Sequence, residues 1–286
     1  MMEKKKLINE IIDKTELMRR DCIEMGFAAG SQGAHFGPAL SCVDIVATLF
    51  FSVMNHDPKN PEMPERDRFV LSKGHACLAY YAALIETGYI PRDMISQFKG
   101  NNSILSGHPS MNMRYGIEVT TGSLGNGLPV ACGMAMAAKV KGESHRVYCI
   151  IGDGECNEGI IWEAAFNAAK YKLDNLIAIV DVNGFQLSGV TSDVMPINLD
   201  ALWKAAGWKV TLIENGNDVE EVLKVLTEAT KSDNGKQPQV ILANTIKGKG
   251  ISFMENNLGF HAAPINDEQY KQAIADLNMA ETGRKE

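Results

Sequence analysis

The sequence predicts an α/β fold with a doubly wound, mostly parallel sheet flanked by helices. Two short, β-branched apolar runs, residues 146–151 and 176–182, flank a helix-sized segment, and both runs are too apolar for surface strands. Segments with the period of a helix alternate with apolar runs along the rest of the chain. With 286 residues and 45% hydrophobic content the chain can bury one large core, and it contains no linker-like or repetitive tract. We therefore expect a single domain over residues 1–286.

The other elements follow from the same patterns in chain order. Helical periodicity predicts helices at residues 5–28, 41–54, 75–88, 128–141, 159–171 and 218–231. Further apolar runs predict strands at residues 209–213 and 240–243. The segment 128–141 is apolar nearly all round, so we expect it to be buried in the core, against another subunit, or both.

The composition indicates a cytoplasmic protein and argues against two classes of partner. A net charge of −7 is unfavourable for nucleic-acid binding. No run approaches the ~18 apolar residues that a membrane span requires, and the first residues form a mixed-charge amphipathic segment that does not resemble a signal peptide. The cysteines form no CxxC pair and several lie in apolar patterns, so we expect buried free thiols in a reducing compartment. They are Cys22, Cys42, Cys77, Cys132, Cys149 and Cys156.

Polar residues directly follow both predicted central strands. Asp153 follows the first strand and Asn183 follows the second. A right-handed strand–helix–strand unit brings the carboxyl ends of both strands to one edge of the sheet, where open α/β sheets bind ligands. A carboxylate, an amide oxygen and a backbone carbonyl suit a hard divalent cation such as Mg²⁺. Gly152 and Gly154 allow backbone N–H groups to approach an anion, for which a diphosphate is the natural candidate.

The tripeptide GDG around Asp153, followed after twenty-eight residues by Asn183, resembles the signature of thiamine-diphosphate enzymes. Glu158 and the residues after it make the segment similar to transketolase in particular. The resemblance implies thiamine diphosphate as cofactor. It also implies Mg²⁺, or Ca²⁺ or Mn²⁺ in its place, held by Asp153, the Asn183 side chain and the backbone carbonyl of Phe185. Gly154 would donate to the diphosphate, and we expect Asp153 on a surface loop.

Four of the six histidines lie in stretches that resemble transketolase segments: His35, His75, His108 and His261. Each follows a glycine directly or within two residues, which suits loops that lie close to a ligand. The resemblance implies that His75 and His261 contact the diphosphate and that His35 and His108 face the reacting carbons of a sugar. His35, His108 and His261 are therefore the candidate catalytic residues, since imidazole can exchange protons with substrate hydroxyls near neutral pH. We expect the remaining two histidines to be structural.

Two glycine-rich stretches extend the resemblance. Residues 121–127 resemble the family's loop against the aminopyrimidine and thiazolium rings, and their GxxGxG spacing differs from a dinucleotide fingerprint. Residues 245–250 resemble the segment whose first lysine, here Lys247, reaches the diphosphate. The remaining residues that the resemblance places at the cofactor are Gly122, Ser123, Leu124, Glu158 and Leu187.

The resemblance extends from about residue 21 to residue 265, but it covers only the amino-terminal, diphosphate-binding part of a transketolase. The pyrimidine-binding half supplies the glutamate that activates the cofactor, and no residue here matches it. We therefore expect one subunit of a split transketolase, active only with a carboxy-terminal partner subunit that carries the pyrimidine-binding domain. The starting Met and the charged end AETGRKE favour this interpretation over a fragment. The family arrangement further implies a homodimer of this chain within an α2β2 complex, with Glu158 near the two-fold axis.

The reaction implied is transfer of a two-carbon ketol unit from a ketose or ketose phosphate to an aldose. Three alternatives remain open at this point. The first is another thiamine-diphosphate enzyme, such as a deoxyxylulose-phosphate synthase-like protein or the α subunit of an oxo-acid dehydrogenase. The second is a non-catalytic scaffold that binds the cofactor. The third is a magnesium-dependent phosphatase or nucleotide-binding protein, although the chain lacks a Walker lysine and a second clustered carboxylate.

Overall fold

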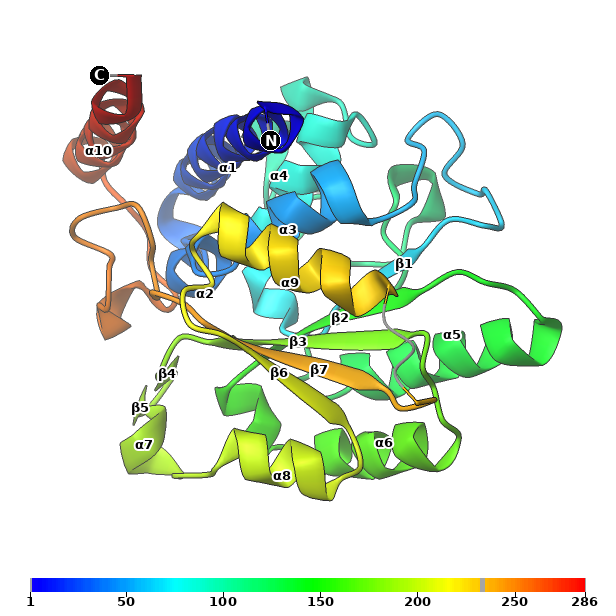
Figure 1. Ribbon diagram of the computed structural model, residues 1–286. Coiled ribbons are helices and arrows are strands. Elements are labelled where there is room, and N and C mark those ends of the chain that lie inside the picture. Colours follow the sequence, from blue (N-terminus) through cyan, green and yellow to red (C-terminus); the bar gives the residue numbers. More distant parts are fainter. Residues whose placement is uncertain (1, 232–234, 286) are drawn as a thin grey trace.

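A five-stranded parallel sheet lies at the centre of the protein in a computed structural model that describes residues 2–231 and 235–285 (Figure 1). Every neighbouring pair of strands is parallel. The doubly wound sheet expected from the sequence is thereby confirmed. Across the sheet the strands are β1 (Arg68–Leu71), β2 (Val147–Gly152), β3 (Leu176–Val182), β7 (Gln239–Asn244) and β6 (Lys209–Ile213).

Helices cover both faces of this sheet (Figure 1). One face packs against α1 (Met2–Ala28), α2 (Phe36–Leu40), α3 (Val43–Thr48), α4 (Cys77–Thr87) and α9 (Val219–Lys231). The opposite face packs against α5 (Gly127–Lys141), α6 (Gly159–Lys170) and α8 (Leu199–Ala205). The last helix, α10 (Asp267–Lys285), lies against α1.

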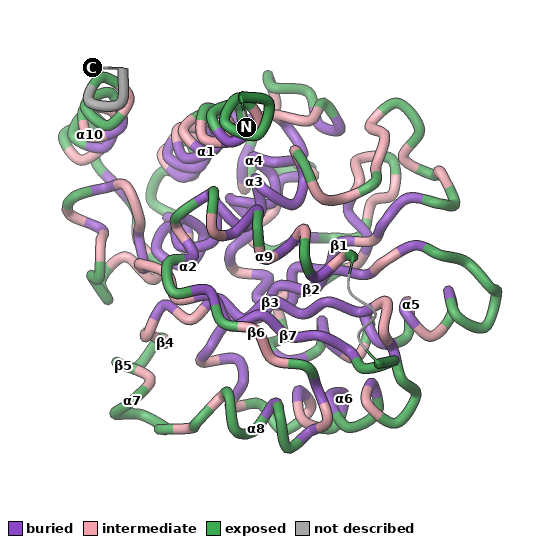
Figure 2. Tube along the Cα trace, in the orientation of Figure 1, coloured by how far each residue is buried: buried purple, intermediate pink, exposed green. Residues whose placement is uncertain are grey.

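Residues of the central strands alternate between the two cores. Ile150 of β2 and Ile179 of β3 join the core on the α1 side, whereas Ile151 and Val180 join the core on the α5 side. Figure 2 shows β2 and β3 buried along almost their whole lengths. Burial on both faces explains why these two runs lack the polar alternation of a half-exposed strand.

Most of the predicted helices occur within a few residues of their predicted bounds, but two differ in kind. The helix predicted at residues 41–54 is α3 followed by a π-helical turn, η2 (Leu49–Val53). The helix predicted at residues 75–88 is α4 preceded by a short 3-10 turn, η3 (Gly74–Ala76). Short elements were not predicted. They are β1, α2, α8, the hairpin β4 (Phe185–Gln186) and β5 (Gly189–Val190), α7 (Thr191–Val194), and the 3-10 turns η1 (Gly30–Gln32), η4 (Arg92–Gln97), η5 (Met113–Tyr115), η6 (Gly154–Asn157) and η7 (Leu258–Phe260).

Helix α5 is buried on one side only. Leu128, Ala131 and Ala135 face the core, while Val130 is 38% exposed and Val140 is 82% exposed in the single chain. The expected burial of this segment in the core is therefore confirmed on the sheet side, and burial against another subunit stays a prediction. All six cysteines are buried free thiols, as predicted. Within the described ranges, no helix is both long enough and apolar enough to span a membrane.

Candidate active site

The carboxyl ends of β2 and β3 bring Asp153 and Asn183 to the same edge of the sheet. Gly152, the last residue of β2, is the register partner of Asp181 in β3. The Asp153 carboxylate accepts hydrogen bonds from the backbone N–H of Gly154 at 2.8 Å and of Gly184 at 2.7 Å. Asp153 therefore joins the loops that follow the two strands, as the strand–helix–strand geometry predicts.

Asp153 does not lie on a surface loop as expected. It is only 6% exposed, because it lies in the turn where β2 ends and the 3-10 turn η6 begins. Burial, followed by the negative charge of Asp181, raises the pKa of Asp153 to about 6, although the Gly154 and Gly184 N–H groups and Lys73 act in the opposite direction.

The residues around Asp153 fit a hard cation bound through mixed oxygen ligands. The amide of Asn183 donates to Asp181 at 3.0 Å, while its Oδ1 accepts from the Phe185 N–H at 3.1 Å. Within residues 2–231 and 235–285 no group of three or more His, Cys, Asp or Glu side chains forms a metal cluster. A cation here would depend on one carboxylate together with neutral oxygens, which suits Mg²⁺ better than a transition metal.

Beneath this edge lies a buried network that the sequence analysis missed. Asp181 is fully buried and accepts hydrogen bonds from Ser41 at 2.6 Å, from Asn183, from Thr245 and from the ammonium of Lys73. Burial alone would raise the pKa of Asp181, but the charge and hydrogen bond of Lys73 and the two hydroxyl donors lower it. An aspartate inside an apolar run was the only signal for this residue in the sequence.

The four predicted histidines converge, although they come from widely separated segments. The ring centroid of His35 lies 5.6 Å from that of His75 and 5.7 Å from those of His108 and His261. His75 and His261 are stacked with centroids 5.3 Å apart. Burial, then the charges of His108 and neighbouring lysines, lowers the pKa of His35 to about 4. Burial, then Lys247, lowers that of His261 to about 4, so both rings are neutral at pH 7.

Lys247 reaches the same cluster from the segment that follows β7. Its ammonium lies 3.0 Å from Nδ1 of His261 and 5.6 Å from the centroid of the Phe185 ring. Burial, followed by the charge of Lys73, lowers the pKa of Lys247 to about 8. The stem of this lysine passes over Gly37, where an added Cβ would lie 3.0 Å from the lysine Cε. A Cβ at position 37 would therefore crowd the lysine stem and the Phe260 carbonyl oxygen, which is also 3.0 Å away.

The loop at residues 121–127 closes the site beside β1. Gly122 has a φ of 147°, and a Cβ there would lie 3.1 Å from Cγ of His108. Glu155, which the sequence analysis did not single out, anchors this loop. Its buried carboxylate accepts from the Gly125 N–H at 2.7 Å, from the Gly152 N–H at 3.0 Å and from the Ser72 hydroxyl at 2.6 Å. All the hydrogen-bond partners of this acid are thus internal to the chain.

These elements enclose a cavity of about 350 Å³, a size suited to a cofactor. Its lining includes most of the predicted site residues: His35, His75, Gly122, Leu124, Asp153, Gly154, Glu158, Asn183, Phe185, Leu187, Lys247 and His261. Ser123 and His108 are not part of the lining, although His108 packs against His35. The residues of the lining that were missed include Lys73, Glu155, Asn157 and Gln186. A second cavity of about 580 Å³ shares Asp153 and Asn157 with it.

Comparisons of the sequence and of the structure with known proteins all match transketolases. The family model described as transketolase, thiamine diphosphate binding domain, matches residues 9–282. The chain is 43% identical over 270 residues to one of the subunits of the apulose-4-phosphate transketolase of Actinobacillus succinogenes, covering 94% of this chain and 96% of that protein. It is 43% identical over 244 residues to a 6-deoxy-6-sulfo-D-fructose transketolase subunit of Clostridium sp., covering 85% and 88%. The crystal structure of transketolase from Campylobacter jejuni superposes with a TM-score of 0.83 at 32% identity, covering 96% of this chain and 43% of that one.

Proposed function

This chain belongs to the transketolase family, and on that premise we propose that it is the thiamine-diphosphate-binding subunit of a split transketolase. The reaction is transfer of a two-carbon ketol unit from a ketose or ketose phosphate to an aldose. The observation that carries the proposal is the convergence of four histidines, Lys247, Asp153 and Asn183 at one sheet edge. The 96% coverage of a relative that is itself named as a transketolase subunit supports the split arrangement.

We propose that thiamine diphosphate binds with Mg²⁺, for which Ca²⁺ or Mn²⁺ can substitute. Asp153, the Asn183 side chain and the Phe185 carbonyl would hold the metal. The diphosphate would contact Gly154 and three cationic or imidazole groups, those of His75, Lys247 and His261. The ring portion would lie against Gly122, Ser123, Leu124 and Leu187. When bound, the cofactor supplies the electron sink for breaking a carbon–carbon bond.

The histidines of this chain then exchange protons with the sugar. His35 and His261 are neutral at pH 7 because their pKa values are near 4, so each ring offers one donor and one acceptor nitrogen. His108 lies beside His35 at the outer end of the cluster. We assign His35, His108 and His261 to hydrogen bonding and proton exchange with substrate hydroxyls. Lys247, whose ammonium lies 3.0 Å from His261, would neutralise part of the diphosphate charge.

A partner subunit is needed for activation of the cofactor. The one glutamate buried in the cavity wall, Glu155, already accepts three hydrogen bonds from its own chain. Glu158 is exposed, as expected for a residue at a subunit contact. We therefore propose a carboxy-terminal subunit that supplies the pyrimidine-binding acid, and a cytoplasmic α2β2 complex. In this complex Glu158 and the exposed flank of α5 lie at the contact between two copies of this chain.

The test is ketol transfer measured with each chain alone and with both chains mixed. We expect no turnover by this chain alone and restored turnover on mixing, with phosphorylated and unphosphorylated ketose donors compared in parallel. Turnover of pyruvate in place of ketose would assign the complex to another class of thiamine-diphosphate enzyme. Cofactor binding without turnover of either substrate would favour a scaffold role. Calorimetric binding of MgATP without thiamine diphosphate would favour a nucleotide site. Robust turnover by the single chain would falsify the split-enzyme proposal.

A further inference from the structure

Lys247 lies on a short connection, residues 245–250, that we call the strap. The strap leaves β7 and crosses the carboxyl edge of the sheet. Gly248 and Gly250 have φ values of 76° and 91°, so the strap passes twice through backbone conformations that glycine adopts readily. A backbone of this kind has little stiffness of its own. An internal hydrogen bond, from the Lys249 N–H to the Ile246 carbonyl at 3.2 Å, spans Lys247, and contacts from outside the strap add to it.

One such contact comes from Asn217, in the loop between β6 and α9. Its Oδ1 accepts a hydrogen bond from the N–H of Ile246, the residue directly before Lys247, at 2.9 Å. Its Nδ2 donates to the backbone carbonyl of Ser41 at 3.0 Å and to the Asp44 carboxylate at 2.8 Å. Asn217 thus connects the strap to helix α3 through both ends of its amide.

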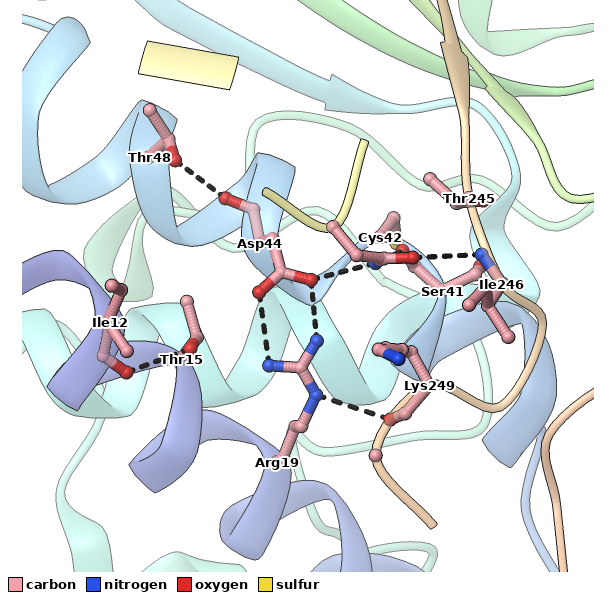
Figure 3. A network of polar contacts seen from close by, with 12 residues as sticks. Ile12, Thr15, Arg19, Ser41, Cys42, Asp44, Thr48, Thr245, Ile246 and Lys249 are labelled. Atoms are coloured by element: carbon pink, nitrogen blue, oxygen red, sulfur yellow. Dashed lines mark hydrogen bonds and ion pairs between the residues drawn. The ribbon is translucent and has the colours of Figure 1, made fainter. Parts of the chain in front are cut away.

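A second contact comes from Arg19 of helix α1. Its guanidinium forms two hydrogen bonds with the Asp44 carboxylate, at 3.1 and 2.5 Å, and its Nε donates to the Lys249 carbonyl at 3.2 Å. Figure 3 shows the guanidinium lying between Asp44 and Lys249, with the backbone nitrogen of Ile246 nearby. The Arg19 and Asp44 side chains are 8% and 5% exposed, respectively. We call Arg19, Asp44 and Asn217 the clamp.

The clamp holds the strap on both sides of Lys247, at the amide of residue 246 and at the carbonyl of residue 249. A buried ion pair contributes little net stability compared with apolar residues of the same volume, so its presence here is better explained by geometry. On the inner side, the Gly248 N–H donates to the Gly37 carbonyl at 3.0 Å, directly beneath the Lys247 stem. Together these contacts direct the ammonium toward His261.

We propose that Asn217, supported by the Arg19–Asp44 pair, is a positioning residue that holds Lys247 against the diphosphate end of the cavity. This rests on the proposed role of Lys247 in binding thiamine diphosphate. Asn217 lies outside the cavity lining and touches no candidate cofactor ligand with its side chain. Its effect on the cofactor is therefore indirect, and its contact with the strap, through the Ile246 N–H, is the one that leads to Lys247.

The experiment is a double-mutant cycle on the full chain, with the dissociation constant for Mg²⁺–thiamine diphosphate measured by calorimetry. Asn217→Ala should raise this constant about ten- to hundredfold, as for other groups that orient a contacting side chain. In a Lys247→Met background the same substitution should leave the dissociation constant almost unchanged, because the lysine side chain that Asn217 positions is gone. Equal effects in both backgrounds, or an unchanged constant in Asn217→Ala, would overturn the proposal.

Thr48→Val is the matched control. Thr48 donates to the Asp44 carbonyl at 2.7 Å, on the side of Asp44 away from the strap. The variant should lower Tm through the lost hydrogen bond and leave cofactor affinity unchanged. A loss of affinity equal to that of Asn217→Ala would mean that destabilisation alone explains the result. If Asn217→Ala does not fold, Asn217→Ser takes its place in the cycle.

A readout without cofactor separates this proposal from the proposed function. The His261 ring signal, assigned in NMR spectra with His261→Gln, reports on Lys247, whose charge helps to lower the pKa of His261 to about 4. Asn217→Ala should raise this pKa as Lys247→Met does. An unchanged His261 pKa would overturn the clamp even if the wild type binds thiamine diphosphate. If Asn217→Ala raises the His261 pKa but the wild-type chain binds no thiamine diphosphate, the result would support the clamp and contradict the proposed cofactor.

Discussion

Asp153 and Asp181 lie at the carboxyl ends of neighbouring strands, and their surroundings shift their pKa values in opposite directions. Asp181 is the more deeply buried, yet its pKa is lowered, because Lys73, Ser41 and Thr245 all donate to it. The pKa of Asp153 is raised to about 6, because burial and the charge of Asp181 outweigh its two backbone donors. The cation that compensates Asp181 is part of the chain. On the proposed function, the cation that would compensate Asp153 is the bound metal.

This difference separates a structural carboxylate from a candidate ligand. Both residues are almost inaccessible in the single chain, so burial alone does not distinguish them. What distinguishes them is whether the chain supplies a counter-charge within hydrogen-bond distance. Asp21 shows that a raised pKa by itself is also insufficient. Its pKa is raised to about 7 by burial on helix α1, yet it does not line the cavity and is paired with the half-exposed Arg92.

The largest expected effect is that of Asp153→Asn. This substitution should abolish Mg²⁺-dependent binding of thiamine diphosphate, because it removes the one anionic ligand. The stability of the cofactor-free chain should change little, because relief of the buried charge is offset by loss of one of the two backbone N–H bonds that the carboxylate accepts. Calorimetry measures the binding, and thermal unfolding without ligand measures the stability. Asp174→Asn, at a surface carboxylate paired with Lys139, is the control. Binding equal to that of the wild type would contradict the metal assignment.

Asp181→Asn should act mainly on stability, in contrast to Asp153→Asn, and should cause a large loss of it. Removing the carboxylate leaves the ammonium of Lys73 buried without its counter-charge, which costs about 3–5 kcal/mol of the free energy of unfolding. Adding Lys73→Met should recover much of this loss, because an apolar pair of similar volume is often neutral. Urea unfolding of the single and double variants checks both statements. A loss below about 1 kcal/mol for Asp181→Asn would show that the pair is not effectively desolvated.

Asn183→Ala should weaken binding less than Asp153→Asn, by about tenfold, because it removes a neutral ligand and leaves the carboxylate in place. The substitution also removes a donor to Asp181, so a small loss of Tm should accompany it. Asn183→Ser, which keeps an oxygen, should recover part of the affinity. If Asn183→Ala were as damaging as Asp153→Asn, the amide would contribute more than a neutral ligand does.

The smallest effect concerns Asp21 and tests whether a raised pKa away from the site affects only stability. Its folded pKa of about 7 exceeds the ordinary 3.8, so its contribution to stability is fully present below about pH 4 and is lost as pH rises through 7. Arg92, Glu86 and Glu24 face it and set this balance. Between pH 5 and 8 the Tm of the wild type should therefore fall relative to that of Asp21→Asn. The fall should be roughly 2–4 °C for each kcal/mol of unfolding free energy that is lost.

Thermal unfolding across this pH range measures the slope, with the exposed Asp93→Asn as control. Parallel Tm curves for the wild type and Asp21→Asn would show that Asp21 titrates normally. Cofactor affinity at pH 8 should be the same in both, because Asp21 does not line the cavity.

The sequence was sufficient for features that depend on local pattern. Strands β2 and β3 were predicted because burial on both faces leaves a continuous apolar run, whereas β1, with four residues, gave no such signal. At the site, Asp153 and Asn183 were predicted because their spacing follows from one strand–helix–strand unit. Their roles, and those of the histidines and Lys247, stay predictions until binding and turnover are measured.

The residues that were missed act through contacts over long sequence distances. Asp181 contacts Ser41, 140 residues away, and Asn217 contacts Asp44, 173 residues away. No spacing rule links such pairs, because the tertiary fold alone brings them together. The predicted surface position of Asp153 was wrong, because the turn at the end of β2 packs against the loop after β3, whose Gly184 N–H donates to the carboxylate.

The cavity has one further consequence, for synthesis of the protein. Its lining begins at His35 and ends at His261, so a ribosome must have released nearly the whole chain before the last wall is present. Strand β1 likewise has to wait for β2, since residue 68 pairs with residue 147. A nascent chain therefore exposes apolar strand edges for many seconds, at synthesis rates of about 5–20 residues per second. On the proposed function, cofactor capture must wait until residue 261 has been synthesised, which would make it a marker of completed folding.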